Sequence, residues 1–326
     1  MTTDVSDSAD VRGDPYEVDA PWMTRVLQRA GVARGATVDV VRVDAFIGTG
    51  QMARSVRLGL EWNDGEGRPP SVVAKVPSDD PTARTTGFAH SSYRTEWAFY
   101  NELAPTVAIR TPACYAALYD EAKPDFVIVM EDLAGSRQGD QFAGLTVDQA
   151  ALAMEQAAGL HGPRWGDPTL RSFMPDRPKG AQSAEYLGLL YGAMVDPFIE
   201  RLGAGLDPDV VDLALRLAPQ IATWATGSDT AETIIHLDFR PDNFLFAEAP
   251  DAPPLVVVDW QTVTSGLAMF DVAYVLGGSF LPADRSACER ALVREYLDRL
   301  TTHGVDYDED TAWTDYRRGA LWGLVM

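Results

Sequence analysis

The chain has 326 residues, 46% of them hydrophobic, which is enough for two lobes or domains with sizeable cores. Its formal net charge of -21 argues against nucleic acid or an anionic membrane as the main partner, because both favour a basic face. Only Cys114 and Cys288 occur and no apolar run approaches the ~20 residues of a membrane span, so we expect a soluble, cytoplasmic protein without a disulfide framework.

The N-terminal residues are acidic and contain no apolar core. Residues 1–18 are therefore expected to form a flexible, solvated tail rather than a signal peptide. Asp19 and Pro21 then predict the start of a short helix, and Gly31 predicts its end.

Two strands are predicted at residues 38–47 and 54–62, joined by a turn that contains Gly48 and Gly50. A second turn, residues 63–67, closes the pair. Because glycine lets the backbone approach a ligand closely, the first turn can lay backbone amides over phosphate groups. Taken alone, the two glycines are more typical of an ordinary hairpin turn.

Lys75 stands out in the third predicted strand, residues 71–77. It lies in an apolar run, where an ammonium group is costly unless it has an acidic partner. The helix predicted over residues 91–103 offers Glu96 as the best candidate and Glu102 as the alternative. The other interpretation is a strand lysine whose head group lies at the solvent edge, with both carboxylates on an exposed helix face.

Beyond this helix the pattern changes from strands to helices. A hairpin of strands at 113–119 and 126–130 would complete a sheet of about five strands. Helices are then predicted over residues 146–161, 183–200, 208–224, 268–277, 284–302 and 309–326. We interpret His161 as a structural or capping residue, and the sparse histidines and cysteines offer no credible zinc site.

The stretch from Thr233 to Thr264 carries three oxygen-bearing side chains next to two apolar runs. Asp238 and Asn243 lie in the polar loop after the first run, and Asp259 ends the second. Two short strands would present these groups at one edge, where they can orient a hydroxyl and hold Mg²⁺ against phosphates. Any one of these residues alone could be a turn residue whose side chain hydrogen-bonds nearby backbone groups. The three together predict a phosphoryl-transfer site.

The order His-Leu-Asp238, Asn243 and Asp259-Trp-Gln resembles the catalytic loop and metal-binding segment of the protein-kinase-like superfamily. It is most similar to the aminoglycoside phosphotransferase family, with its ecdysteroid-kinase-like and choline-kinase-like relatives. The resemblance implies that Asp238 orients or deprotonates the acceptor hydroxyl and that Asn243 and Asp259 hold Mg²⁺. Lys75 matches the lysine that pairs with the nucleotide phosphates.

The resemblance also implies roles for residues outside this set. Asp271 matches an Asp that steadies the catalytic-loop backbone, and His236 is expected to support the same loop. Arg240 either stabilises the transferring phosphoryl group or is a surface arginine. The strand pattern of residues 126–130 ends before Glu131 and Leu133. The family has a hinge at this place, whose backbone hydrogen-bonds the adenine.

The fold implied is α+β, a bilobal protein-kinase-like fold. An N-terminal nucleotide-binding lobe, residues 19–132, is expected to contain an antiparallel sheet of about five strands and one key helix. A mostly helical catalytic and substrate lobe, residues 133–326, is expected to follow. The family commonly carries more helix beyond the apolar run at 322–326, which favours a C-terminal truncation.

The function predicted is an ATP-dependent kinase that uses Mg²⁺ to phosphorylate a hydroxyl of a small molecule. Antibiotic, sterol-like and metabolite acceptors, ATP or GTP, and the oligomeric state stay open. Aromatic residues of the variable helices, such as Trp313 and Trp322, are more typical of a helix core than of a binding site. The alternative is a nucleotide-binding pseudoenzyme or regulatory module. A protein kinase is disfavoured because residues 260–270 leave no room for a long activation segment.

Overall fold

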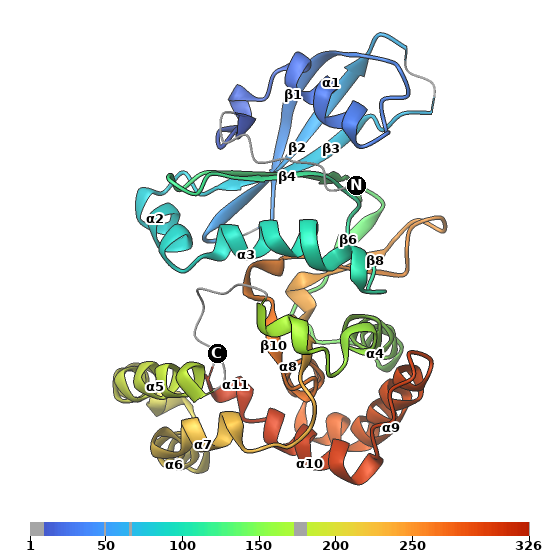
Figure 1. Ribbon diagram of the computed structural model, residues 1–326. Helices are drawn as coiled ribbons and strands as arrows, with labels where there is room; N and C mark the ends of the chain where they lie inside the picture. Colours follow the sequence, from blue (N-terminus) through green and yellow to red (C-terminus); the bar gives the residue numbers. More distant parts are fainter. Residues whose placement is uncertain (1–9, 49, 65–66, 173–180, 326) are drawn as a thin grey trace. The chain divides into compact units, whose positions relative to one another are not determined.

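The computed structural model describes residues 10–48, 50–64, 67–172 and 181–325 (Figure 1). The chain divides into two compact units, of which the first contains residues 1–139 and 243–263 and the second contains residues 140–242 and 264–326. The predicted lobe boundary after residue 132 stays a prediction. The predicted acidic tail lies partly outside the described residues, as do residues 49 and 65–66 of the two predicted turns.

A five-stranded antiparallel sheet in the order β1-β2-β3-β5-β4 forms the centre of the first unit. Its strands are β1 (Val38–Ile47), β2 (Ala53–Trp62), β3 (Ser71–Pro77), β4 (Cys114–Tyr119) and β5 (Phe126–Glu131). Lys75 of β3 pairs with Ser55 of β2 and with Ile128 of β5, so it lies in the interior of the sheet. Successive side chains of a strand point to opposite faces, so Ala74 and Lys75 lie on different sides of the sheet.

Helices cover both faces of this sheet. Asp19 caps α1 (Ala20–Arg29), because its carboxylate accepts a hydrogen bond from the Trp22 N–H at 2.8 Å. The apolar side of α1 packs in one core cluster with the face of β3 that carries Ala74. On the other face lies α3 (Ser92–Ala98), whose Tyr93 stacks on Phe126 with ring centroids 4.3 Å apart (Figure 1).

Two features around α3 differ from the expectation. The helix predicted over 91–103 ends earlier, and a π-helical turn, Phe99–Leu103, continues it. A helix that was not predicted, α2 (Pro81–Ala89), precedes it. Its local signal was present, since the Asp80 carboxylate caps the Ala83 N–H at 2.7 Å and Pro81 occupies the first turn.

A small sheet in the order β6-β8-β9 brings residues 243–263 into the first unit. Its strands are β6 (Ser136–Gln138), β8 (Phe244–Ala247) and β9 (Leu255–Val257). Strand β6 was not predicted, because three residues are too few for a recognisable alternation. The β8–β9 hairpin positions the two side chains that the sequence suggested as metal ligands.

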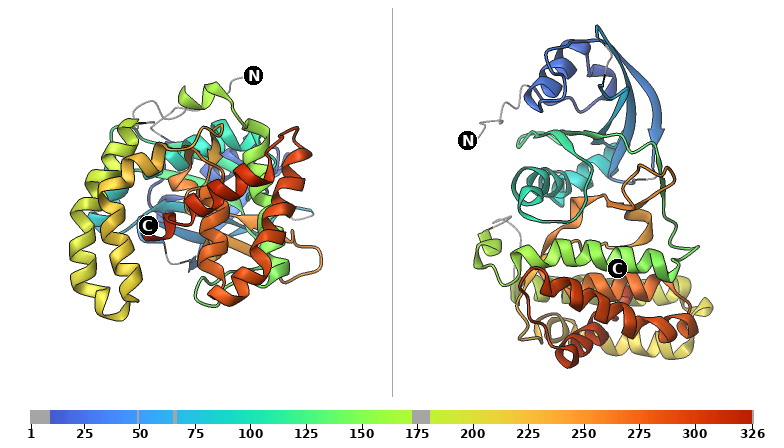
Figure 2. Two further views of the ribbon diagram at one scale, coloured as in Figure 1. Left: turned by 90° about the horizontal axis from the view of Figure 1, so that it is seen from below. Right: turned by 90° about the vertical axis from the view of Figure 1, so that its right-hand side faces the viewer.

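The second unit is mostly helical, with a short β7–β10 ladder. Its elements are α4 (Val147–His161), α5 (Ala181–Leu202), α6 (Pro208–Leu217), α7 (Ile221–Thr226), β7 (Thr233–Ile235), β10 (Thr264–Gly266), α8 (Met269–Ser279), α9 (Pro282–Thr301), α10 (Glu309–Gly319) and α11 (Trp322–Val325). Helix α4 packs on α9 and α8 on α10, and Figure 2 shows α5 and α6 side by side.

The predicted α+β fold class is confirmed by these elements. One predicted helix, residues 208–224, is divided into α6 and α7 by a 3₁₀ turn that contains Pro219, whose ring cannot continue a regular helix. None of the described helices is long and apolar enough to cross a lipid bilayer.

Candidate active site

Lys75 is paired with two carboxylates inside the first unit. Its Nζ lies 2.8 and 2.7 Å from the two carboxylate oxygens of Glu96 and 2.8 Å from Oδ1 of Asp259. Burial lowers the pKa of Lys75, but the carboxylates of Asp259 and Glu96 outweigh burial and hold that pKa above its ordinary value. The lysine is therefore a fixed positive charge. Glu102, the alternative partner, is exposed on the following π-helical turn.

Asn243 and Asp259 lie at the same end of the β8–β9 hairpin. The Val258 N–H donates to the Asn243 carbonyl at 3.0 Å, so the residue before β8 and the residue after β9 are neighbours. Asn243 is buried, whereas the Asp259 side chain keeps 27% of its surface exposed. Amide and carboxylate oxygens are hard ligands of the kind that Mg²⁺ prefers, so the two donor types fit this ion.

The segment after β9 is anchored to α3 and the turn that follows it. Trp260 is fully buried and stacks on Phe99, with ring centroids 3.8 Å apart and an interplanar angle of 4°. Its N–H also donates to Oε1 of Glu96 at 3.3 Å. Asp259 itself has a φ of 68°, in the left-handed region that is unfavourable for residues other than glycine. These contacts hold Asp259 in a strained backbone conformation that turns its carboxylate to Lys75.

Glu131 and Leu133 lie where the chain leaves β5. The Glu131 carboxylate accepts two hydrogen bonds from Nη2 of Arg110, at 2.7 and 3.0 Å. Next to it, Asp132 accepts hydrogen bonds from Nε and Nη2 of Arg57 at 2.7 and 3.0 Å. These acidic side chains therefore hold the local structure. A nucleotide contact at Glu131 and Leu133 through the backbone stays a prediction.

The turn between β1 and β2 requires glycine at two positions. Gly48 has a φ of 77°, and a Cβ at Gly50 would lie 2.5 Å from the Ala53 carbonyl oxygen. A cavity of about 260 Å³ adjoins this turn. Arg54 lines it, and Nη1 of Arg54 lies 2.8 Å from Oδ2 of Asp79. A close approach of phosphate to this turn stays a prediction.

In the second unit, Asp238 and Arg240 belong to one network of charges. Nε of Arg240 lies 2.9 Å from Oδ1 of Asp238, and Nη1 lies 3.0 Å from Oδ2 of Asp242. Nη1 also donates to Oε1 of Gln141 at 2.9 Å. The guanidinium is thus held by two carboxylates and an amide, which places a fixed positive charge directly beside Asp238.

Asp271 holds the backbone just before Asp238. The side chain is buried, and its two oxygens accept hydrogen bonds from the His236 N–H at 2.7 Å and the Leu237 N–H at 2.8 Å. Leu237 has a φ of 70°, so this backbone is strained. Nε1 of Trp322 donates to the Leu237 carbonyl at 2.9 Å and holds the same residue from its other side.

His161 and Tyr296 continue this network into α4 and α9. Nε2 of His161 lies 3.1 Å from Oδ2 of Asp271, and Nδ1 lies 2.9 Å from the Tyr296 hydroxyl. Burial raises the pKa of Tyr296 well above its ordinary value, so its hydroxyl stays protonated and can donate. Because a carboxylate only accepts, we assign a proton to Nε2 of His161, which donates it to Asp271. His161 is thus a buried link to the loop.

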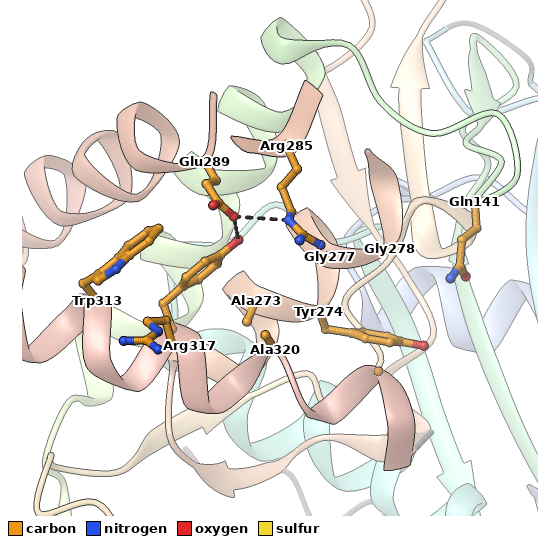
Figure 3. A pocket seen from close by; sticks show the side chains of 12 residues that line it. Gln141, Ala273, Tyr274, Gly277, Gly278, Arg285, Glu289, Trp313, Arg317 and Ala320 are labelled. Carbon is orange, nitrogen blue, oxygen red and sulfur yellow. Dashed lines mark hydrogen bonds and ion pairs between the residues drawn. The ribbon is translucent and has the colours of Figure 1, made fainter. Parts of the chain in front are cut away.

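A cavity of about 750 Å³ opens among α8, α9 and α10 of the second unit (Figure 3). Gln141 lines it and accepts the hydrogen bond from Arg240. Tyr274 also lines it, and its pKa is raised first by burial and next by the Asp238 carboxylate. The cavity therefore begins beside the Asp238 loop. Trp313 lines this cavity, contrary to its expected place in a helix core, whereas Trp322 is buried.

The predicted site residues fall into two sets. The first unit contains Gly48, Gly50, Lys75, Glu96, Glu131, Leu133, Asn243 and Asp259, and the second contains His236, Asp238, Arg240 and Asp271. Within these sets Lys75 contacts Glu96 and Asp259, and Arg240 contacts Asp238. Gln141 and Tyr296 were not predicted, because neither belongs to a local pattern that marks a site.

Comparisons with known proteins identify the family and the fold. Residues 61–318 match the model of the phosphotransferase enzyme family. No curated protein sequence matches the chain significantly. The GDP complex of wild-type aminoglycoside 2′-phosphotransferase-IIIa has a similar fold, with a TM-score of 0.54, 16% identity and coverage of 95% of this chain and 90% of that chain.

Choline kinase from Cryptosporidium parvum Iowa II gives a TM-score of 0.51 at 11% identity, over 87% of this chain and 80% of that chain. A GDP and kanamycin complex of APH(2″)-IIIa gives 0.54 at 14% identity, over 94% and 89%. At these identities the structures show a shared fold. The family model covers most of the sequence, so the chain belongs to the phosphotransferase enzyme family.

Proposed function

We propose that this phosphotransferase is an ATP-dependent, Mg²⁺-requiring kinase that transfers the γ-phosphoryl group to a hydroxyl of a small molecule. One observation carries the proposal: Asp238 lies beside the Arg240 guanidinium, which donates to Gln141 in the lining of a cavity of about 750 Å³. A carboxylate in this position can orient a hydroxyl group that enters from the cavity.

The first unit would bind the nucleotide. Lys75 would contact the phosphate oxygens, and Glu96 would keep its ammonium group charged and aimed. Asp259 now shares the same ammonium group, so a phosphate would take the place of one of its partners. The turn with Gly48 and Gly50 would supply backbone N–H groups, and the backbone near Glu131 and Leu133 would hold the base. The GDP complexes of the similar aminoglycoside phosphotransferases support a purine nucleotide as donor.

Asn243 and Asp259 would hold the metal ion. Mg²⁺ supplies charge neutralisation on the phosphate oxygens when it is bound. The donor set supports this ion, because one buried amide and one partly exposed carboxylate lie at the same hairpin end.

Asp238 would accept the hydroxyl proton as the acceptor oxygen forms its bond to phosphorus. The bond between phosphorus and the bridging oxygen of the nucleotide breaks in the same transfer, and the nucleoside diphosphate leaves. Arg240 would stabilise negative charge on the moving phosphoryl group. Asp271, through the His236 and Leu237 amides, would keep the loop in the conformation that aims Asp238. The acceptor would occupy the cavity beside this loop.

A thermal-shift titration tests the nucleotide half of the proposal. At about a hundredfold excess over its dissociation constant, Mg·ATP or Mg·GTP should add roughly 2.7 kcal/mol of stability. The shift should require Mg²⁺ and shrink in Asp259→Ala, because that variant removes a metal ligand. Asp39→Ala is the matched control, since Asp39 is an exposed carboxylate of β1 in the same unit. Equal nucleotide shifts in both variants would contradict the assignment of Asp259.

A further inference from the structure

The cavity of Figure 3 contains more positive than negative charge, although the whole chain has a net charge of -21. Its charged lining residues are Arg285 and Arg317, which are positive, and Glu289, which is negative. The local charge therefore differs in sign from the average charge of the molecule.

The one carboxylate of this lining, Glu289, already has two partners. Nε of Arg285 lies 3.3 Å from Oε2 of Glu289, and the Tyr316 hydroxyl donates to the same oxygen at 2.8 Å. Figure 3 shows these two contacts as dashed lines. Burial raises the pKa of Tyr316, and Glu289 raises it further, so the hydroxyl stays a donor. The charge of Glu289 is thus compensated within the protein.

Arg317 differs from the other arginines near the cavity. Its guanidinium forms no ion pair with any residue in the described part of the chain. Arg290 stacks on the Trp313 ring at 4.0 Å and lies 3.9 Å from Glu309, which also pairs with Arg294. Glu309, in the first turn of α10, is therefore used by two other arginines, and the exposed Arg317 pairs with no carboxylate of the described residues.

Two exposed glycines of the lining have open space beside them. A Cβ added at Gly277 or Gly323 would meet no atom within 4 Å, and Ala273 and Ala320 are the small residues beside them. Trp313 and Tyr274 add aromatic surface. Arg317 and Gln141, the partner of Arg240, line this same cavity, so one acceptor in it can meet both.

We infer that the acceptor is a hydroxyl compound with an anionic oxygen group, a carboxylate or a phosphate, which pairs with Arg317. This inference rests on the proposed function of the cavity. A guanidinium forms its strongest hydrogen bonds with such oxyanions. An ammonium-rich acceptor would lose water beside Arg285 and Arg317, and the one carboxylate of the lining, Glu289, is already paired, so this part of the cavity selects against it.

Two matched series of acceptors test the inference by ADP release with saturating Mg·ATP. One series is gluconate, glucose and glucosamine, and the other is hydroxymethylbenzoate, its amide and hydroxymethylbenzylamine. Within a series the anionic member should have a kcat/KM about ten- to a hundredfold above the ammonium member, because one charge-assisted hydrogen bond changes binding by that factor. Turnover that favours the ammonium member, or no turnover of either anionic compound, overturns the inference.

Arg317→Glu gives a second, independent readout. The KM of the preferred anionic acceptor should rise at least about tenfold, because a like charge then faces the anion. The Mg·ATP thermal shift should stay the same. Arg216→Glu makes the same change of charge on an exposed part of α6, outside the cavity lining, and serves as the matched control. An equal KM in the two variants overturns the role of Arg317.

Gly277→Gln tests the site itself, since it adds a side chain in open space at a residue of the cavity lining. It should raise the same KM, while Gly192→Gln at an exposed position of α5, where a Cβ also meets no atom, should leave it unchanged.

The experiments distinguish failure of the proposed function from failure of the proposed acceptor class. If the proposed function is wrong, Mg·ATP gives no shift and no ADP is released. If only the acceptor class is wrong, the shift remains and ADP release follows neutral or ammonium acceptors.

Discussion

Replacing Asp238 by Asn should abolish phosphoryl transfer while nucleotide binding survives. The amide keeps the shape of the side chain but cannot accept a proton, and a positioned general base contributes roughly 10²- to 10⁴-fold to rate. Asp238 lies in the second unit, and the proposed nucleotide ligands lie in the first. ADP release with a pool of hydroxyl compounds should therefore fall to background, with an unchanged Mg·ATP thermal shift.

Asp242→Asn is the matched control for this substitution. Asp242 contacts the same guanidinium, 3.0 Å from Nη1 of Arg240, but we assign it no proton transfer. Its loss of activity should be much smaller than that of Asp238→Asn. Near-normal turnover in Asp238→Asn, or equal losses in the two variants, would show that Asp238 acts only through the charge network.

Asp271→Ala should be the most destabilising substitution in the second unit. It leaves the His236 and Leu237 N–H groups and the His161 ring without their carboxylate partner in a buried place. Each unsatisfied buried group costs about 1–3 kcal/mol, so the free energy of unfolding should fall by roughly 3–5 kcal/mol. For a chain of this size, Tm should drop by about 10 °C.

Asp271→Asn should have an intermediate effect, since it keeps one acceptor oxygen. Asp212→Ala removes an exposed carboxylate that lies 2.8 Å from Arg216, and this pair should contribute at most about 1 kcal/mol. The Tm values of the three variants therefore rank the contributions. An Asp271→Ala protein as stable as Asp212→Ala would refute the buried network as the support of the catalytic loop.

Local signals in the sequence predicted much of the fold. Alternation and turn residues give β1 and β3 with the observed bounds, and Thr146 with Gln149 forms the expected capping box. These elements depend on neighbours within a few positions, which periodicity and capping describe well. Pro219 was also a local signal that residues 208–224 form two helices. The prediction followed the continuous apolar pattern instead and gave one helix.

The contacts that shape the candidate site depend on the tertiary fold. His161, Asp271 and Tyr296 come from α4, α8 and α9, so no local spacing predicts their network. A tryptophan gives the same apolar periodicity in a helix whether it faces a cavity or a core. The sequence therefore could not show that Trp313 lines the cavity. The sequence predicted that two short strands present Asp238, Asn243 and Asp259 at one edge, and the structure places Asn243 and Asp259 at one end of the β8–β9 hairpin. Their roles as metal ligands stay predictions.

The distribution of charge around the cavity also depends on the tertiary fold. A net charge of -21 argued against partners that favour a basic face, yet the cavity lining has an excess arginine. Sequence totals cannot reveal such a local change of sign, because it depends on which carboxylates have partners. Glu289 is compensated by Arg285 and Tyr316, and Arg317 pairs with no carboxylate of the described residues, which is why we propose it as the charge that an acceptor meets.

Transfer of labelled γ-phosphate from ATP tests the central claim most directly. The wild-type protein is incubated with Mg²⁺, labelled ATP and a mixed pool of hydroxyl compounds and proteins, and the label is followed by fraction. We predict that label enters the small-molecule fraction, depends on Mg²⁺ and is lost in Asp238→Asn. Binding of Mg·ATP without any transfer, or label only in the protein fraction, would contradict a small-molecule kinase and favour a nucleotide-binding module or a protein kinase.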